Sequence, residues 1–303
     1  MEASISIIIA TASRVKSLRR LLEDLTRLES VEGIDHEVIV ANNAPDETLA
    51  REIEGVVLDY SRRGNFACWQ VRVPLPGKCR AQNSAISETR GSALAFLDDD
   101  VEVTPQWLKA VSEFFKNYHY DVMQGPILFS EEMQRSEEFM RIYRRFRTIP
   151  FVNYGDRVME VNTLTGGNMA LRREIFPRVG FFDERLGPGR SGISEDVEFA
   201  QRILRNGGKI GYEPKARVFH EVDWSRLTEE FFRIRHEQQG RSRLIYKKQS
   251  VLSIAPNLMR SIWTYILYSL VGNERKKYRA KGRYFHYMAM LREKMKVFER
   301  SLD

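Results

Sequence analysis

Three adjacent carboxylates, Asp98, Asp99 and Asp100, form the cluster in this chain that is best suited to chemistry. They follow the apolar run Ala93–Leu97, whose short length and preceding glycine predict a buried strand. Adjacent carboxylates repel one another unless water or a cation offsets their charge. Mg²⁺ and Mn²⁺ prefer oxygen ligands and often hold substrate phosphates as well. Because ligands collect at the carboxyl ends of strands in open α/β sheets, the triplet indicates a metal–diphosphate site, and the alternative is a solvated acidic turn.

A second acidic pair, Glu195 and Asp196, is predicted to lie in the first turn of a helix that Ser194 caps and Gly207 ends. The helix dipole favours carboxylates in that turn, which is a sufficient structural explanation for them. The functional alternative is that a rigidly held carboxylate beside the glycine-rich loop 185–194 acts as a general base. We therefore treat the pair as candidate catalytic residues.

Two further features have both a functional and a structural interpretation. The pair Gly166-Gly167 lets the backbone approach a ligand closely, but it also suits a turn before a strand. His220 ends a predicted strand, where a lone histidine is more often structural than a ligand.

Residues 187–192 match GxGxxG, but they neither follow a strand nor open a helix, so they do not predict a dinucleotide site. Their glycines favour a mobile substrate loop.

The elements that must position these residues alternate along the chain between strand and helix patterns. Leu18, Leu21 and Leu25 recur at helical spacing between two apolar, β-rich runs, which predicts a parallel right-handed unit. Residues 61–77 are polar and predict a loop, and 81–89 predict a helix. The predicted strands are Ile5–Ala10, Glu37–Ala41, Val56–Tyr60, Ala93–Leu97, Tyr120–Leu128, Lys209–Tyr212 and Ala216–His220.

The composition excludes several classes of protein. With 303 residues, 43% of them hydrophobic, the chain can bury a large core and suits one α/β domain with an appendage. Its two cysteines are too few for a disulfide scaffold and lack metal-site spacing, which indicates a reducing compartment. The first residues lack the pattern of a secretory signal, so we expect a cytoplasmic protein.

The last eighty residues differ in charge from the rest. Residues 224–303 carry 18 lysines and arginines against 7 aspartates and glutamates, a net charge of +11, whereas the remainder is mildly acidic. Residues 251–271 are apolar and near spanning length, but Pro256, Asn257 and Arg260 argue against a simple span. A basic, aromatic stretch follows, so we predict attachment to an anionic membrane surface through residues 251–285. The alternative is a helix packed on the catalytic domain or on a second subunit, as in a homodimer.

Taken in order, these features resemble the family 2 glycosyltransferases, which have the GT-A fold of nucleotide-diphospho-sugar transferases. The resemblance covers about residues 4–222. It implies an α/β fold with a mixed, mainly parallel sheet flanked by helices in a catalytic domain of residues 1–222. It leaves residues 223–303 as a basic, helical C-terminal extension. The matching pieces are Ile7-Ile8-Ile9 with Thr11 and Arg14, Ala81-Gln82-Asn83, Leu97-Asp98-Asp99-Asp100, Gly166-Gly167-Asn168, Glu195-Asp196 and His220.

The resemblance also implies roles for single residues. Asp196, with Glu195 beside it, would be the base that deprotonates the acceptor hydroxyl. Asp100 would bind a divalent metal, Mn²⁺ or Mg²⁺, and His220 would be a further ligand of the metal or the diphosphate. Ala41 stands where the family often carries an aspartate that reads the base, and a one-residue slip would bring Asn42 into that role. The residues implied to bind the nucleotide sugar are Thr11, Arg14, Asn42, Lys78, Arg80, Asn83, Asp98, Asp99, Gly167 and Asn168.

The activity that the resemblance implies is a metal-dependent, inverting glycosyl transfer. The donor would be a nucleoside-diphosphate sugar, with UDP as the default, and the acceptor a hydroxyl of a glycan or glycolipid. Such an enzyme would serve polysaccharide or cell-envelope glycan synthesis and would be peripheral to the inner face of a membrane.

Two other functions compete with this one. A nucleotidyltransferase would need a glycine-rich, basic phosphate loop after the first strand, and residues 11–16 contain no glycine. A non-enzymatic module that binds RNA through the basic tail would leave the acidic triplet unexplained, so nucleic acid is not the expected partner.

Overall fold

The computed structural model of the protein describes residues 3–63 and 66–299, which fall into two compact units. The first unit contains the chain up to Ser130 together with Pro150–Glu184 and Glu195–Glu221. The second contains Glu131–Ile149, Arg185–Ser194 and the chain from Val222 onward. The last junction lies close to the division predicted at residue 222, and two internal segments of the expected catalytic domain belong to the second unit.

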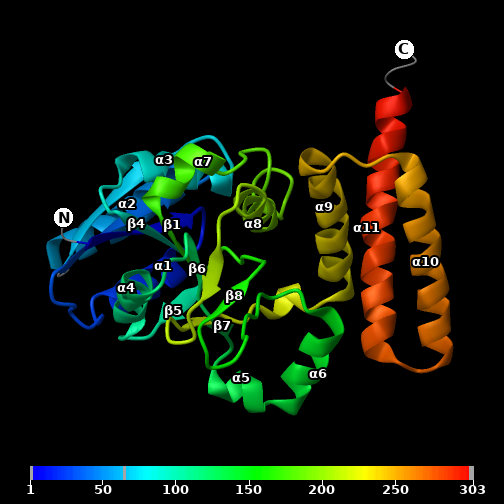
Figure 1. The fold of residues 1–303 in the computed structure, drawn as a ribbon, viewed down its shortest axis with the longest axis horizontal. Helices are drawn as coiled ribbons and strands as arrows, with labels where there is room; N and C mark the ends of the chain where they lie inside the picture. The colour runs from blue at the N-terminus through cyan, green and yellow to red at the C-terminus, as the bar shows by residue number, and fades with distance from the viewer. Residues whose placement is uncertain (1–2, 64–65, 300–303) are drawn as a thin grey trace. The chain divides into compact units, whose positions relative to one another are not determined.

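The first unit is built on a mixed sheet of eight strands within the described residues (Figure 1). Strands β1, β2, β3 and β4 run parallel, and β9 joins the edge of β4 in the antiparallel direction. The predicted α/β class with a mainly parallel sheet is therefore confirmed. In spatial order the strands are β3 (Ala67–Arg72), β2 (Ile34–Asn42), β1 (Ala3–Thr11), β4 (Ala93–Asp98), β9 (Asn168–Arg172), β6 (Val122–Gln124), β10 (Ile210–Tyr212) and β8 (Met159–Val161).

A small second sheet lies in the same unit, and its first strand begins directly after the acidic triplet. It consists of β5 (Val101–Val103), β11 (Val218–His220) and β7 (Ile127–Leu128). Because β11 pairs antiparallel with β5, His220 lies opposite Val101, the residue after Asp100.

The helices of the first unit cover both faces of the large sheet, because neighbouring residues of a strand point to opposite faces. Ile7 and Ile9 of β1 pack with α1 (Val15–Leu25), α2 (Glu47–Arg63) and α4 (Trp107–Asn117). Ile8 packs in a second core with α3 (Lys78–Glu88), α7 (Phe176–Val179) and α8 (Glu195–Arg205), and the short helix η1 (Arg173–Ile175) precedes α7. Parallel strands buried on both faces require such continuous apolar runs.

Three predictions of local structure were wrong. Residues 56–60 are part of helix α2, where Ile53, Val57 and Tyr60 pack at helical spacing on the core. The predicted loop 61–77 contains β3, an edge strand in which four of the six residues are hydrophobic but which is preceded by the polar residues 61–65. The predicted strand 120–128 is divided at Gly125-Pro126 into β6 and β7, which belong to different sheets.

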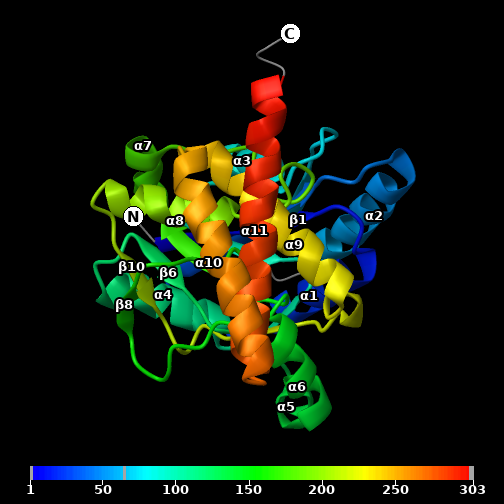
Figure 2. The same ribbon diagram turned by 90° about the vertical axis from the view of Figure 1, so that its right-hand side faces the viewer.

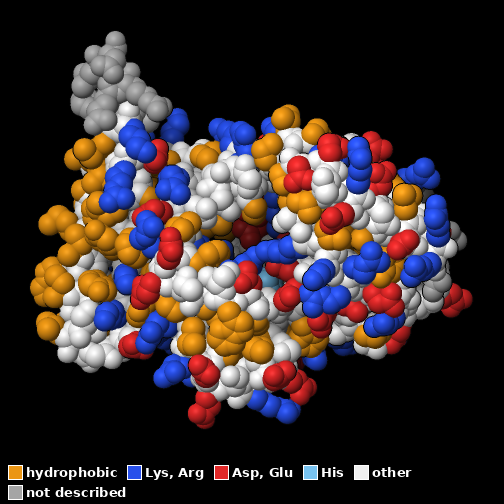
Figure 3. Space-filling view, turned by 180° about the vertical axis from the view of Figure 1, so that it is seen from behind, with side chains coloured by type: hydrophobic (Ala, Val, Ile, Leu, Met, Phe, Trp, Pro, Cys, Tyr) orange, Lys and Arg blue, Asp and Glu red, His pale blue; other side chains and the backbone are white. Residues whose placement is uncertain are grey.

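The second unit is helical, as predicted for the C-terminal extension. Helix α11 packs against both α9 and α10 (Figures 1 and 2). Figure 3 shows hydrophobic side chains gathered over α10. Within the described ranges, no helix has the length and apolar character needed to cross a membrane. The helices are α5 (Glu131–Arg135), α6 (Glu137–Phe146), η2 (Trp224–Arg226), α9 (Glu229–Tyr246), α10 (Val251–Leu270) and α11 (Glu274–Glu299).

Helices α9 and α11 approach closely at Gly240, where an added Cβ would overlap the carbonyl oxygen of His286. We expect Gly240→Ala to lower the free energy of unfolding by about 1–3 kcal/mol, because one helix must shift to make room. Gly55→Ala is the matched control, since Gly55 lies in helix α2 with no atom within 4 Å of the added Cβ. It should raise the free energy of unfolding by about 0.5–1 kcal/mol. Urea denaturation followed by circular dichroism measures both, and equal changes would contradict the tight crossing.

Candidate active site

The acidic triplet lies at the carboxyl end of β4, in the turn that leads into β5. Asp99 and Asp100 are only 6% and 7% exposed. The triplet is therefore not a solvated turn, and its charges must be balanced by other side chains.

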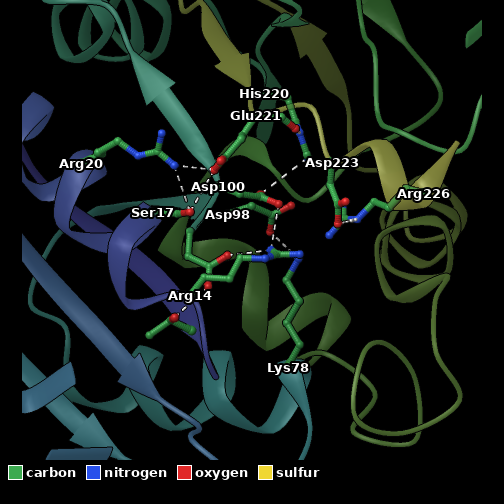
Figure 4. Close-up of polar contacts among 12 residues, drawn as sticks. Arg14, Ser17, Arg20, Lys78, Asp98, Asp100, His220, Glu221, Asp223 and Arg226 are labelled. Carbon is green, nitrogen blue, oxygen red and sulfur yellow. Dashed lines mark hydrogen bonds and ion pairs between the residues drawn. The ribbon is translucent and has the colours of Figure 1, made fainter. Parts of the chain in front are cut away.

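Lys78 is the first of these balancing groups. Its Nζ lies 2.5 Å from Asp98 Oδ1 (Figure 4). The same Nζ lies 3.6 Å from Glu195 Oε1. Burial alone would lower the pKa of Lys78, but the two carboxylates outweigh burial and raise it. Burial opposes ionisation of Asp98 as well, yet Lys78 lowers the pKa of that carboxyl. Lys78 thus remains charged and links the triplet to the acidic pair of helix α8.

Arg14 and Thr11 balance the middle and last carboxylates from the end of β1. Arg14 Nη1 lies 2.9 Å from Asp99 Oδ1 and 2.8 Å from Asp100 Oδ2. The Thr11 hydroxyl donates to Asp99 Oδ2 at 2.7 Å. Burial raises the pKa of Asp99 despite the nearby guanidinium. Parallel pairing of β1 with β4 positions these groups, because Ala10 lies opposite Asp98.

His220 faces the triplet from β11. Its Nδ1 lies 2.6 Å from the Glu221 carbonyl oxygen, which can only accept, so Nδ1 carries the proton. In the neutral ring Nε2 therefore presents a lone pair, 3.5 Å from Asp100 Oδ1. The Glu221 side chain accepts from Ser17 Oγ and Arg20 Nη2 (Figure 4). An imidazole nitrogen and a carboxylate oxygen in this arrangement suit a divalent cation such as Mn²⁺.

In the parts of the chain that the structure describes, no group of three or more histidine, cysteine, aspartate or glutamate side chains is arranged to hold a metal ion by itself. Asp100 and His220 would thus supply two ligands, and further oxygens would have to come from a substrate or from water. That division is common for Mg²⁺ and Mn²⁺ bound with a diphosphate.

The acidic pair occupies the first turn of α8 as predicted from the sequence. Burial raises the pKa of Glu195 to about 7, Lys78 opposes that rise and Asp196 adds to it. Asp196 is oriented by two backbone donors, Val197 N–H at 2.8 Å and Gly166 N–H at 3.2 Å. The carboxylate is thus held in place by main-chain groups from two segments.

The two glycines of the pair differ in the space around them. A Cβ on Gly167 would lie 3.0 Å from Asp98 Oδ2, and one on Gly166 would lie 3.5 Å from Lys78 Nζ. A side chain at position 167 would therefore crowd Asp98, whereas one at position 166 would begin with an ordinary van der Waals contact.

Four predicted nucleotide-binding residues use their side chains within the protein. Asn42 is fully buried and donates to the Ala50 carbonyl and to Gln70. Asn168 donates to the Pro126 and Ala216 carbonyls and accepts from Trp107. Asn83 bonds the Phe182 backbone, and Arg80 pairs with Glu184 at 3.0 Å. The structure brings together the remaining ones: Thr11, Arg14, Lys78, Asp98, Asp99 and Gly167 with Asp100, Glu195, Asp196 and His220.

Asn43 is a residue that the sequence analysis missed. Its amide donates to the carbonyls of Val73 and Leu75, and its oxygen accepts from the Gly77 N–H. These bonds fix the segment that places Lys78 at the start of α3. The turn-forming run of residues 42–46 was the available signal, since asparagine side chains commonly bond nearby backbone in such turns.

Comparisons with known proteins show what this chain is similar to. The family model described as "Glycosyl transferase family 2" matches residues 6–180. Succinoglycan biosynthesis protein ExoM of Rhizobium meliloti (strain 1021) is 27% identical over 247 residues, which are 81% of this chain and 76% of that protein. Glucosyl-dolichyl phosphate glucuronosyltransferase of Haloferax volcanii is 24% identical over 181 residues, 55% of this chain and 57% of that protein.

Among solved structures, the fold is similar to mannosyltransferase PcManGT from Pyrobaculum calidifontis, in complex with GDP-Man and Mn²⁺. The TM-score is 0.61 at 12% sequence identity, and the match covers 96% of this chain and 86% of the other.

Proposed function

The chain belongs to glycosyl transferase family 2, and from that premise we propose that it is a metal-dependent, inverting enzyme that uses a nucleoside-diphosphate sugar. The acceptor would be a hydroxyl of a glycan or a lipid-linked glycan. The observation that carries the proposal is the bridge that Lys78 makes between Asp98 and Glu195. It joins the acidic triplet, where a divalent cation would hold a diphosphate, to the turn that holds the candidate base.

The donor site would be formed by the ends of β1 and β4 and the start of α3. Arg14 and Lys78 are cations that a diphosphate would attract, and both already contact carboxylates of the triplet. Asp98 would accept a hydrogen bond from a ribose hydroxyl, and it lies next to Gly167, where a Cβ would come within 3.0 Å of Asp98 Oδ2. UDP remains the default nucleotide of the donor, and Asn42, whose amide bonds within the fold, gives no support to another base.

Asp196 would act as the general base. As the acceptor oxygen forms its bond to the anomeric carbon, the hydroxyl proton passes to the Asp196 carboxylate. The bond between the anomeric carbon and the diphosphate oxygen breaks in the same step, and its electron pair leaves with the nucleoside diphosphate. Attack from the face opposite the leaving group inverts the anomeric configuration. The protein contributes mainly by holding these groups in line.

Asp100 and His220 would hold the divalent cation, since their facing oxygen and nitrogen fit its ligand preference. When bound, such a cation neutralises negative charge on the leaving diphosphate. Arg14, which pairs with Asp100 at 2.8 Å, adds a fixed positive charge to the same region.

A nucleotide panel tests the donor site. We expect UDP, GDP, CDP or dTDP to raise the melting temperature when Mn²⁺ is present, because a ligand that binds only the folded state stabilises it by about 2.7 kcal/mol at 100 times its Kd. Asp100→Asn should lose the Mn²⁺-dependent part of that rise, while Glu54→Gln, an exposed carboxylate of α2, should keep it. An unchanged Mn²⁺-dependent rise in Asp100→Asn would remove Asp100 from the metal site, and no response to any nucleotide would contradict the proposed donor.

We propose further that the enzyme works in the cytoplasm at the inner face of a membrane. The basic charge of residues 224–303 supports this location, and a lipid-linked acceptor would require it. One relative is named glucosyl-dolichyl phosphate glucuronosyltransferase.

A further inference from the structure

Helix α10 carries an apolar stripe that faces solvent, consisting of Leu252, Met259, Trp263, Ile266 and Leu270. These side chains are between 53% and 86% exposed. Figure 3 shows hydrophobic side chains gathered over this helix. Their spacing of seven, four, three and four residues places them on one side of the helix. An exposed apolar surface of this extent marks an interaction site more often than chance.

The other side of α10 is already used for packing. Ile254, Leu258 and Ser261 are buried, and α10 packs on α11. The helix begins at a capping box in which Ser250 and Ser253 bond each other's backbone N–H groups. The stripe is therefore a second apolar face on a helix that the unit itself holds in place.

Four uncharged polar side chains of α10 bond the backbone of their own helix. Ser261, Thr264 and Ser269 each donate to the carbonyl four residues earlier, at 2.7 or 2.8 Å. Asn257 donates to the Ser253 carbonyl in the same way. These four side chains therefore lose little when water is replaced by an apolar phase.

The charges beside the stripe favour an anionic surface as its partner. Residues 250–281 contain six lysines and arginines but a single acidic residue, Glu274. Lys276 lies over the Tyr268 ring at 5.2 Å, and Lys277 lies over the Tyr265 ring at 6.0 Å. Exposed tryptophan with tyrosines and lysines alongside is the pattern of a membrane interface. Two copies docked through this face would instead bring like charges together.

We propose that the α10 stripe inserts among the headgroups of an anionic lipid bilayer, with the helix lying along its surface. The inference rests on the proposed function in one respect: membrane binding would hold the enzyme where a lipid-linked acceptor is carried. The occupant is identified by its chemistry: an apolar layer under a negatively charged surface.

Vesicle sedimentation of the full chain tests the proposal. We expect binding to phosphatidylcholine vesicles that contain phosphatidylglycerol, weaker binding to phosphatidylcholine alone, and a loss at high salt, because surface charge attraction is screened. Trp263→Ser with Leu270→Ser should weaken binding about tenfold or more. Leu58→Ser, which removes an exposed leucine from α2, is the matched control and should bind as the unaltered chain does.

A fluorescence measurement on the unaltered chain does not depend on how the double variant folds. Trp263 emission should shift to the blue when anionic vesicles are added, and Trp263→Phe should remove that shift from the four-tryptophan signal. Failure to bind anionic vesicles would overturn the proposal. A dimer that Trp263→Ser with Leu270→Ser converts to monomer, in the absence of vesicle binding, would overturn it in favour of a subunit interface.

The same samples separate this inference from the proposed function. A Mn²⁺-dependent response to nucleoside diphosphate without vesicle binding would refute the docking surface alone. Vesicle binding without any nucleotide response would refute the donor site alone.

Discussion

Asp196→Asn is expected to lower the turnover number about 10²–10⁴-fold, which is the usual contribution of a general base. Asp196 is proposed to take the acceptor proton, so the affinity for the donor should change little. Release of nucleoside diphosphate from the donor found in the nucleotide panel measures turnover, and the thermal shift measures donor affinity.

Asp196→Asn also changes the hydrogen bonds that hold this side chain, so the experiment needs a control for stability. Two N–H groups donate to the Asp196 oxygens, and an amide can accept only one of these bonds. The melting temperature without ligand must therefore be compared with that of the unaltered chain. Glu54→Gln should retain full turnover. Unchanged turnover in Asp196→Asn, or a collapse of donor affinity, would show that this carboxylate does not act as the base.

Lys78→Met is expected to lower the free energy of unfolding by about 3 kcal/mol, because it leaves two largely buried carboxylates without their shared cation. Lys109→Met, which removes an exposed lysine of α4, should cost much less. Adding Asp98→Asn to Lys78→Met should recover part of the lost stability while donor binding stays weak. Urea denaturation measures the free energies.

The pH dependence of this effect has a definite sign. The pKa of Glu195 is raised in the folded protein to about 7 from an ordinary value of 4.5. Its contribution to stability is thus fully present below pH 4.5 and is lost as pH rises through about 7. Without the Lys78 ammonium, ionisation costs more, so Lys78→Met should lose more stability at pH 8 than at pH 5. An equal loss at both values would mean that Lys78 does not stabilise the Glu195 carboxylate.

Much of the fold was predictable because it follows from local patterns. The apolar run before Asp98 predicted a buried strand, and the leucine spacing after residue 15 predicted a helix. The acidic pair was placed correctly in a first turn, because helix dipoles favour carboxylates there. The strand predicted at residues 56–60 was wrong. Its β-branched residues suit a strand, but the spacing of the apolar residues also suits helix α2, in which tertiary packing holds them.

The sequence by itself determined which residue types are available and where each lies on its own element. It identified the triplet, the acidic pair, Lys78 and His220 as candidates, and their roles stay predictions. Only the tertiary structure decided which of them meet. Lys78, Asp98 and Glu195 come from three elements, and His220 reaches Asp100 only because β11 pairs with β5.

The tertiary structure also decided that Asn42 and Asn168 bond inside the fold. The physical reason is the same in each case. Local patterns depend on side-chain spacing within one element, whereas these contacts depend on strand register and helix packing between segments far apart in the chain.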